Sequence, residues 1–369
     1  MDVRCAVIGI GSMGRQYARM IASGEIEGLT LTSVCCRGDE SASWAKTNLP
    51  STVGIYRSED ELYKYEQTFD AVIIVTPHKC HPQMAIRALR ADKHVMCDKP
   101  AGVTVADAQL INKEAERSKG IYAMMCHQRT YAQYQKIKEL LKEGAIGDIT
   151  RILLEDSGFF RTRFYHKSSA WRSSWNGEGG GALINQGYHL LDMWQYLFGL
   201  PISLYAEIPF GKYNDFTVDD EATIIMNYPD KMTGTFIIST GEGTPVQRLE
   251  ICGSRGSILL EDGKLTLTQY DRDTREYARE AQVTSRQNLK TSVKEFNFEG
   301  EDGAYKTMLT NFANAILHDE ELICNGEEGA KALSLVNGAY LSAWKGKKVK
   351  LPVDMEEYLS ALKAAEDNE

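Results

Sequence analysis

The sequence predicts an α/β protein in two parts: a doubly wound parallel-sheet domain, then an α+β domain with a large, mostly antiparallel open sheet. Three observations predict it. A glycine-rich turn follows the first apolar strand, apolar strands alternate with helices to about residue 125, and strands of alternating polarity dominate afterwards. Since 369 residues exceed one ordinary core, we expect domains at 1–125 and 126–369.

Apolar runs in the first part predict the strands of the parallel sheet. They are Val3–Ile8, Leu29–Cys36, Ala71–Thr76, His94–Cys97 and Ile121–Cys126. Helices are predicted at Met13–Ala22, Glu59–Tyr65, Pro82–Ala91 and Val105–Lys119. Strands that are apolar on both faces and separated by helices indicate a sheet covered on both sides.

The second part opens with a connecting helix, Gln133–Gly144, and then changes to strands with period-2 alternation. The predicted strands are Ile149–Ser157, Ser203–Phe210, Ala222–Asn227, Thr233–Thr240, Gln247–Gly253, Gly256–Glu261 and Lys264–Tyr270. Further helices are predicted at Ala182–Leu197, Ala304–Leu317 and Glu327–Trp344, and Asp271–Asn297 is predicted to be a solvated hairpin or loop.

The charge, the cysteine content and the apolar runs limit the kinds of protein that this chain can be. A net charge of −9 provides no basic surplus for binding nucleic acid. The eight cysteines include no C-x-x-C pair and lie largely in apolar runs, so we expect free thiols in a reducing compartment and no metal site. Neither a secretory leader nor a run of about 18 apolar residues is evident, which predicts a cytoplasmic protein with no membrane contact.

The turn Gly9-Ile10-Gly11-Ser12-Met13-Gly14 lies between a strand and a helix. There, glycines allow a tight turn, approach of a pyrophosphate and close helix–strand packing, while the helix N-terminus attracts phosphate. A glycine-rich turn without a ligand is the alternative. The position at the start of an α/β pattern favours a dinucleotide, NAD or NADP.

The end of the second strand bears on the choice between these cofactors. Cys35-Cys36-Arg37-Gly38-Asp39 stands where an acidic ribose ligand is usual. Arg37 could pair with a 2′-phosphate, or it could stack on adenine while Asp39 reaches the ribose. The choice between NAD and NADP therefore stays open.

Lys99 follows the strand His94–Cys97, at the carboxyl edge where open α/β sheets bind ligands. A lysine there can donate to a substrate hydroxyl and stabilise alkoxide character, although a solvated surface lysine is the alternative. Thr76, Pro77 and His78 are expected to line the same edge.

Asn185, His189 and Asp192 have the spacing i, i+4, i+7, which places them within about 60° of arc on a helix. A neutral histidine can accept a hydroxyl proton near pH 7. The alternative is a core histidine satisfied by its neighbours. The preceding Gly179–Gly181 run favours a site, since it lets a ligand or a second backbone approach closely.

Aromatic and arginine side chains crowd the loop before this helix, a composition suited either to sugar binding or to a domain interface. They are Phe159, Phe160, Phe164, Tyr165, Trp171 and Trp175, with Arg161, Arg163 and Arg172 among them. We take Tyr165, Trp171 and Arg172, with Lys99, Asn185 and His189, as the candidate substrate residues.

Taken together, these motifs resemble the Gfo/Idh/MocA oxidoreductases, named for glucose–fructose oxidoreductase and inositol dehydrogenase. The resemblance spans nearly the whole chain. It rests on Gly9–Gly14, Thr76-Pro77 with His81, His94-Val95 with Asp98-Lys99-Pro100, His127-Gln128-Arg129, Gly144–Gly147, Gly179–Asp192 and the tail from Gly326-Glu327-Glu328-Gly329 to Ala339-Tyr340.

The resemblance implies a Rossmann domain, a substrate-binding and oligomerisation domain, a homodimer or homotetramer formed through its sheet, and NAD(P)-dependent chemistry on a sugar, glycoside or cyclitol. It assigns Lys99 and His189 as catalytic residues, with Asn185 beside them, and allows a cis Lys99–Pro100 bond and a tightly bound cofactor. The implied cofactor-binding residues are Gly9, Gly11, Ser12, Met13, Gly14, Arg37, Thr76, Pro77, His78, His81, Asp98, Lys99 and Gln128.

Two positions depart from the family pattern. Asp98 replaces the usual glutamate before the lysine, and Asn185 replaces an aspartate four residues before the histidine, so the acid–base burden falls on His189. A sugar dehydrogenase is our interpretation. A redox-neutral glycosidase or lyase with retained NAD is one alternative, and a non-catalytic sugar or cofactor sensor, which would need neither Lys99 nor His189, is the other.

Overall fold

The computed structural model describes residues 2–287, 289–298 and 303–369. They form two compact units that are not simple ranges of sequence. The first unit comprises residues 1–130, 177–179 and 302–333, and the second comprises 131–176, 180–301 and 334–369. The predicted fold class is confirmed: the first unit contains a parallel sheet and the second a mostly antiparallel one.

The first unit is built on six parallel strands in the order β3-β2-β1-β4-β5-β6. The strands are β1 (Val3–Ile8), β2 (Leu29–Cys35), β3 (Gly54–Tyr56), β4 (Ala71–Ile74), β5 (His94–Cys97) and β6 (Tyr122–Met124). The connecting helices are α1 (Ser12–Ala22), α2 (Asp39–Asn48), α3 (Glu59–Tyr63), α4 (His81–Arg90) and α5 (Val105–Ala115). The strand order reverses between β1 and β4, so the ligand crevice is expected at their carboxyl ends.

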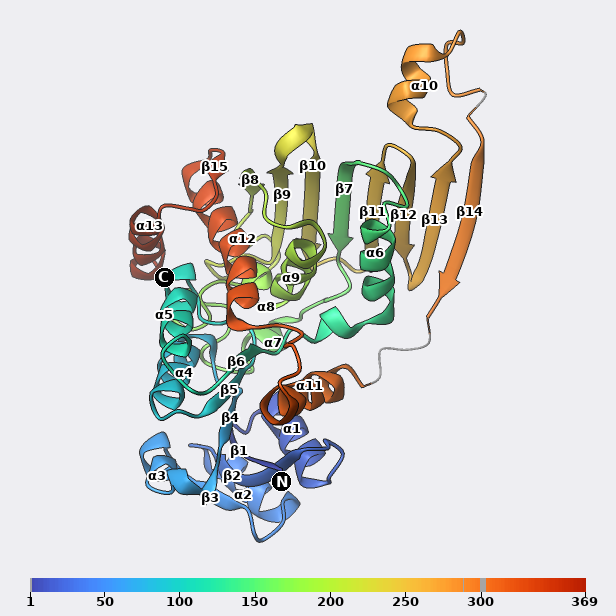
Figure 1. The fold of residues 1–369 in the computed structure, drawn as a ribbon. Helices are drawn as coiled ribbons and strands as arrows, with labels where there is room; N and C mark the ends of the chain where they lie inside the picture. Colours follow the sequence, from blue (N-terminus) through green and yellow to red (C-terminus); the bar gives the residue numbers. More distant parts are fainter. Residues whose placement is uncertain (1, 288, 299–302) are drawn as a thin grey trace. The chain divides into compact units, whose positions relative to one another are not determined.

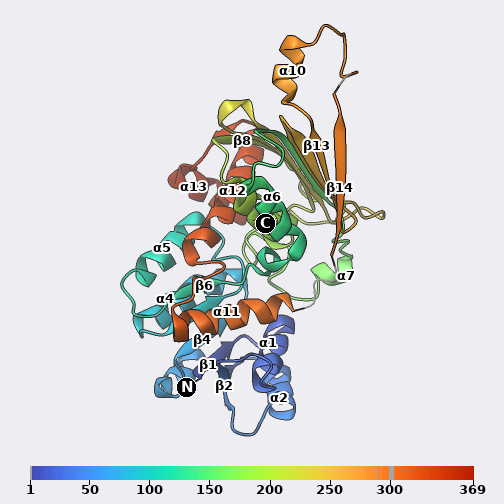
Figure 2. The ribbon, with the colours of Figure 1, turned by 45° about the vertical axis from the view of Figure 1, so that its right-hand side comes forward.

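Residues from late in the chain complete this unit. Helix α11 (Ala304–His318) lies beside α1 (Figures 1 and 2), where the rings of Tyr17 and Tyr305 are 5.6 Å apart. Before α12 (Gly326–Lys345), the carbonyl of Cys324 accepts a hydrogen bond from the β6 residue Met124 at 3.0 Å. Arg129, which is buried, lies 3.5 Å from the carboxylate of Glu328. Two motifs that are nearly 200 residues apart in the sequence thus meet in one unit.

The second unit contains a nine-stranded sheet in the order β14-β13-β12-β11-β7-β10-β9-β8-β15. Its strands are β7 (Ile149–Asp156), β8 (Ser203–Glu207), β9 (Glu221–Asn227), β10 (Thr233–Ser239), β11 (Gln247–Gly253), β12 (Gly256–Glu261), β13 (Lys264–Tyr270), β14 (Thr291–Asn297) and β15 (Val349–Lys350). Among the described pairs only β7 and β10 run parallel.

Helices cover one face of this sheet, among them α6 (Ala132–Lys142) and α9 (Gly187–Phe198) (Figure 1). Contact is close enough to require glycine in β10: a Cβ on Gly234 would lie 2.3 Å from the Trp194 ring. Trp194 is fully buried, and its indole N–H donates to the Tyr228 hydroxyl at 2.7 Å. This packing fixes the register of α9 on the sheet.

The structure corrects the prediction for Asp271–Asn297 and adds elements that the pattern did not indicate. Thr274–Glu280 is a helix, α10, because Asp273 caps its N-terminus by accepting from the backbone N–H of Arg275. Thr291–Asn297 is strand β14, which lies at the edge of the sheet. Its side chains are almost all exposed, so no alternation of apolar and polar residues predicts a strand. The other unpredicted α-helices and strands are α2, β3, α7 (Arg163–His166), β15 and α13 (Met355–Asp367).

The helix predicted at Ala182–Leu197 is present as two consecutive segments, α8 (Ala182–Asn185) and α9. Gln186 between them keeps helical dihedral angles (φ −75°, ψ −47°), so the side chains of both segments follow one helical path. Among the described residues, no helix is both long and apolar enough to cross a membrane.

Candidate active site

The three glycines of the first turn have different surroundings. Gly9 has a φ of +100°, and a Cβ there would lie 2.4 Å from the Val75 carbonyl oxygen. A Cβ on Gly14 would lie 1.8 Å from the Gly9 carbonyl oxygen, so this glycine permits close packing of α1 on the turn. A Cβ on Gly11 would meet nothing within 4 Å. Gly9 and Gly14 therefore serve the fold, whereas Gly11 faces open space.

The open space at Gly11 suits a dinucleotide. Gly11 and Ser12 are exposed at the N-terminus of α1, which has no side-chain cap and no acidic residue in its first turn. A groove of about 850 Å³ begins there and continues past Arg15 and Trp44. Free backbone N–H groups at a helix N-terminus bind phosphate, so these residues fit the pyrophosphate of NAD(P).

One arginine, Arg37, follows β2, and another, Arg57, follows the neighbouring strand β3. Arg57 donates to the carboxylate of Asp39 at 2.6 Å and to the carbonyl oxygen of Arg37 at 2.7 Å. Asp39 is thus held in an ion pair, and Arg37 is exposed with no ion pair or side-chain hydrogen bond among the described residues. This arrangement leaves one guanidinium available at the place where a ribose 2′-substituent would lie.

At the carboxyl ends of β4 and β5, His81 links two loops. Its Nε2 lies 2.6 Å from the Thr76 carbonyl oxygen, and its Nδ1 lies 2.7 Å from the Pro100 carbonyl oxygen. His81 is buried, and the Lys99–Pro100 peptide bond is cis, as the resemblance allows. The structure therefore places His81 as a residue that holds backbone around Lys99.

Lys99 and Asp98 lie in a charged cluster of the first unit. Burial raises the pKa of Asp98, and the positive charges of Lys99 and His81 oppose the rise. Burial, and then the Lys99 charge, lowers the pKa of His127 to about 4. The Lys99 ammonium is thus close enough to act on both neighbours, at the same carboxyl edge as the glycine turn.

Tyr305 of α11 also belongs to this cluster, and the sequence analysis missed it. Its ring centroid lies 4.3 Å from that of His127, and burial, reinforced by Asp98, raises the pKa of its hydroxyl to about 12. No local pattern could have indicated this contact, because almost 180 residues separate the partners. Only information on which distant residues contact each other could have identified Tyr305.

The remaining predicted cofactor residues of this edge differ in their surroundings. His78 is buried, and its Nδ1 lies 3.0 Å from the Glu178 carbonyl oxygen. The Thr76 hydroxyl contacts the sulfur of Met84 at 3.3 Å, and Pro77 begins the short turn that follows. The amide oxygen of Gln128 is buried without a hydrogen-bond partner among the described residues, so it can accept from a ligand N–H. Met13 is half-buried in the first turn of α1.

In the second unit, Asn185 and His189 are more exposed to solvent than the other residues of α8 and the first part of α9. Across residues 181–195, these two side chains are half-buried and every other position is buried. Asp192 is buried and accepts a hydrogen bond from the Gln195 amide at 3.0 Å. The structure thus brings Asn185 and His189 together on an accessible face and places Asp192 in the core.

Asp219 explains the glycines before α8. Its carboxylate accepts from the backbone N–H groups of Gly181 at 2.8 Å and Leu183 at 2.6 Å, and from the Tyr340 hydroxyl at 2.7 Å. A Cβ on Gly181 would lie 1.9 Å from the Asp219 carbonyl oxygen. A second backbone therefore approaches at this point, and Asp219, which the sequence analysis did not identify, anchors the helix that carries His189.

The aromatic loop supplies a second polar cluster in this unit. The Tyr165 hydroxyl accepts from Arg172 at 2.7 Å, Gln186 at 3.1 Å and Asn185 at 3.3 Å. The guanidinium of Arg172 also lies over the Trp171 ring, 4.8 Å from its centroid. The predicted substrate residues Tyr165, Arg172 and Asn185 are therefore in direct contact.

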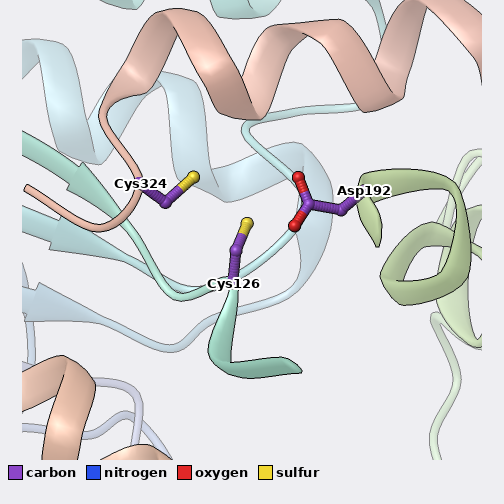
Figure 3. Close-up of side chains that lie close together, drawn as sticks. All are labelled: Cys126, Asp192 and Cys324. Carbon is purple, nitrogen blue, oxygen red and sulfur yellow. The ribbon is translucent and has the colours of Figure 1, made fainter. Parts of the chain in front are cut away.

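Two buried thiols of the first unit, Cys126 and Cys324, point toward each other with sulfur atoms within 4.8 Å (Figure 3). Figure 3 also labels Asp192, which belongs to the other unit. Both residues are buried free cysteines of the first unit.

Comparison with known proteins decides the family. The NAD-binding Rossmann-fold model of the Gfo/Idh/MocA oxidoreductases matches residues 3–126, and the C-terminal alpha/beta domain model of the same family matches residues 138–351. The chain belongs to this family. It is therefore an oxidoreductase with a nicotinamide-binding domain, as the motifs predicted.

The similar proteins differ in their names and in how much of this chain they cover. An uncharacterized oxidoreductase of Schizosaccharomyces pombe, C115.03, is 27% identical over 60% of this chain and 61% of its own length. The myo-inositol 2-dehydrogenase of Thermotoga maritima is 24% identical over 95% of this chain and 98% of that enzyme. Among solved structures, the WlbA dehydrogenase of Bordetella pertussis in complex with NADH and UDP-GlcNAcA has a TM-score of 0.80 at 20% identity, covering 96% of this chain and 100% of that chain.

Proposed function

We propose that this protein is an NAD(P)-dependent dehydrogenase that transfers hydride between the nicotinamide and a hydroxyl-bearing carbon of a sugar, glycoside or cyclitol. One observation carries the proposal. Lys99 follows β5, the glycine turn follows β1, and one strand, β4, separates these two in the sheet. A fixed ammonium at the edge that holds the dinucleotide is suited to stabilise charge on a reacting oxygen.

In the proposed mechanism, Lys99 donates to the oxygen of the reacting carbon and stabilises its alkoxide character. His189 accepts the hydroxyl proton at a ring nitrogen, and Asn185, one helical turn earlier, orients the imidazole or the substrate. A bound nicotinamide supplies the hydride acceptor. Gly11 and Ser12 would hold its pyrophosphate, and the Gln128 amide oxygen is available to its carboxamide.

The names of two similar proteins support the substrate class. One is a myo-inositol 2-dehydrogenase, and the other is a dehydrogenase crystallised with a UDP-linked sugar. Cyclitols and sugars share a ring bearing vicinal hydroxyl groups. The accessible pair Asn185 and His189 supplies an amide and an imidazole, which are hydrogen-bonding groups suited to such hydroxyls.

Replacement of Lys99 tests this function. Lys99→Met should lower the rate of hydride transfer by a factor on the order of 100 or more, as loss of one oxyanion donor does, while cofactor binding and folding persist. Cofactor reduction is followed by absorbance with a panel of sugars and cyclitols, and cofactor affinity by fluorescence titration. Lys113→Met, on the exposed side of α5, is the matched control. Wild-type turnover in Lys99→Met would contradict the proposal.

We further propose that the second unit forms a homo-oligomer through its sheet. Apolar side chains on this sheet remain exposed in the single chain: Ile225 of β9 is 46% exposed and Val293 of β14 is 62% exposed. Burial of such side chains favours association. Light scattering of the purified protein should give a mass of two or four chains, and Ile225→Lys should lower it.

A further inference from the structure

We propose that Glu59 recognises the adenine base of the nicotinamide dinucleotide by accepting a hydrogen bond from its exocyclic amino group. The inference concerns the adenosine end of the cofactor, so it goes beyond the proposed reaction and depends on no particular sugar. It is carried by a carboxylate oxygen that is buried without a donor among the described residues, and by the place of this residue in the first unit.

The place of Glu59 follows from the strand order. In the order β3-β2-β1, the glycine turn that suits the pyrophosphate follows β1, and β2 and then β3 lie to one side of it. An acidic residue at the end of β2 usually binds the adenosine ribose in such folds. The base lies beyond this ribose, so we expect it near the carboxyl ends of β2 and β3. Glu59 follows the end of β3 by three residues.

The turn after β3 is held against the end of β2. The backbone N–H of Cys36 donates to the carbonyl oxygen of Tyr56 at 2.9 Å. The Arg57 guanidinium donates to the carbonyl oxygen of Arg37 at 2.7 Å. The segment that carries Glu59 is therefore fixed at the end of β2, where the usual acidic ribose ligand is missing.

The Glu59 carboxylate is short of donors. Its Oε1 is buried with no hydrogen-bond partner among the described residues, and the side chain as a whole is half-buried. Burial raises the pKa of this carboxyl, the charge of Arg87 opposes the rise, Asp60 adds to it and Arg37 opposes it. Arg87, however, is already engaged, since it donates to Asp60 at 2.7 Å. A buried acceptor without a donor costs free energy, which a ligand N–H would offset.

Tyr63 lies one helical turn after Glu59 and offers the complementary group. Its hydroxyl is also buried with no partner among the described residues. Burial, reinforced by Glu59, raises the pKa of this hydroxyl, so it stays protonated and can donate. The Arg87 guanidinium packs on the Tyr63 ring, 4.3 Å from its centroid. An acceptor and a donor thus lie close together, and neither is paired within the described part of the chain.

Adenine matches these two groups. Its exocyclic amino group donates and its ring nitrogen N1 accepts, so the edge of the base presents a donor next to an acceptor. A carboxylate only accepts, and a tyrosine hydroxyl can donate. Hypoxanthine has the opposite pattern, because it carries a carbonyl oxygen in place of the amino group and a hydrogen on N1. Such a site therefore distinguishes two dinucleotides that are otherwise identical.

The wild-type protein provides the first test. Dissociation constants are measured by fluorescence titration, without sugar, for NADH and for reduced nicotinamide hypoxanthine dinucleotide. If NADPH binds more tightly than NADH, the corresponding pair with the 2′-phosphate is used. The adenine form should bind at least about tenfold more tightly, because the hypoxanthine carbonyl oxygen faces the Glu59 carboxylate without a hydrogen between them. Equal or tighter binding of the hypoxanthine form would overturn the inference.

Glu59→Gln provides the residue-level test. Glutamine has nearly the shape of glutamate, but its amide also donates and can pair with the hypoxanthine carbonyl oxygen. The preference for the adenine form should therefore fall to about threefold or less. Glu66→Gln alters an exposed carboxylate of the same unit and should keep the wild-type preference. An unchanged preference in Glu59→Gln would contradict the inference.

Failure of the inference and failure of the proposed function give different results. The titrations contain no sugar, so a protein that binds NADH but converts no sugar or cyclitol refutes the proposed function and still decides the role of Glu59. Equal binding of the two dinucleotides overturns the role of Glu59 alone. If neither dinucleotide binds, the inference and the proposed function both fail.

Discussion

The Nδ1 atom of His81 lies 2.7 Å from the carbonyl oxygen of Pro100, the residue that follows Lys99. The other ring nitrogen lies 2.6 Å from the Thr76 carbonyl oxygen. Because carbonyl oxygens only accept, both contacts are hydrogen bonds when both ring nitrogens carry protons. Burial lowers the pKa of His81, and the two carbonyl groups and Asp98 oppose that lowering. This histidine therefore ties the Lys99 loop to the end of β4.

His81→Ala should leave a buried carbonyl group without its donor, because the lowered pKa leaves one N–H on the imidazole at pH 7, and should lower the free energy of unfolding by about 1–3 kcal/mol. Because the Lys99 loop loses its tie, hydride transfer should also slow. Urea unfolding at pH 7 measures the first effect. His318→Ala, which removes an exposed histidine at the end of α11, is the control and should change little. An unchanged stability in His81→Ala would contradict this role.

The glycine turn permits a paired test, because Gly11 faces open space and Gly14 does not. Gly11→Val should fold normally and weaken binding of NADH or NADPH about tenfold or more, since its side chain occupies the pyrophosphate position. Gly14→Ala should instead lower stability, since its Cβ would overlap the Gly9 carbonyl oxygen at 1.8 Å. Fluorescence titration and thermal unfolding separate the two outcomes. Unchanged cofactor affinity in folded Gly11→Val would mean that the turn does not contact the cofactor.

Arg37 is the residue that we expect to select the cofactor. Arg57 pairs with Asp39, so the Arg37 guanidinium is the charge available to a 2′-phosphate. Arg37→Ala should weaken NADPH binding about tenfold and NADH binding much less, because only NADPH offers the phosphate. Calorimetric dissociation constants for both cofactors provide the comparison. Equal losses would assign Arg37 to stacking on adenine.

His127 predicts how stability depends on pH. Its pKa is about 4 in the folded protein, below the ordinary value of about 6.5, so the unfolded chain binds the proton more readily. The stability associated with neutral His127 is therefore complete above about pH 6.5 and is lost as pH falls toward 4, by about 3 kcal/mol in all. Urea unfolding at pH 7, 6 and 5 should show a smaller decline in His127→Gln than in the wild-type protein. Identical declines would contradict the assignment.

Elements with a clear local pattern of apolar and polar residues could be predicted from the sequence. Apolar runs defined most strands, and the spacing of Asn185 and His189 correctly placed both on one accessible helical face. Asp192, at i+7, proved to be buried, and its carboxylate accepts a hydrogen bond from the Gln195 amide at 3.0 Å. Helix α2 was missed since Ala45 is its only buried position, which leaves no amphipathic pattern to read.

Contacts between distant segments were beyond the reach of pattern analysis. The Tyr305 ring packs against His127, and Asp219 holds the N-terminus of α8, but neither residue has a local signature of these roles. Similarly, nearly every residue of β14 is exposed. This strand therefore depends on its hydrogen bonds to β13, and burial of its side chains contributes little. Each of these features depends on the tertiary fold.

The central claim is that His189 takes the hydroxyl proton during hydride transfer, and its most direct test is the pH dependence of single-turnover cofactor reduction. In the wild-type protein the rate should fall toward acidic pH, because a protonated imidazole cannot accept a proton. His189→Ala should abolish that acidic limb together with most of the rate, and Asn185→Ala should reduce the rate less and keep the limb. An acidic limb that survives in His189→Ala, or an equally severe loss in Asn185→Ala, would contradict the account.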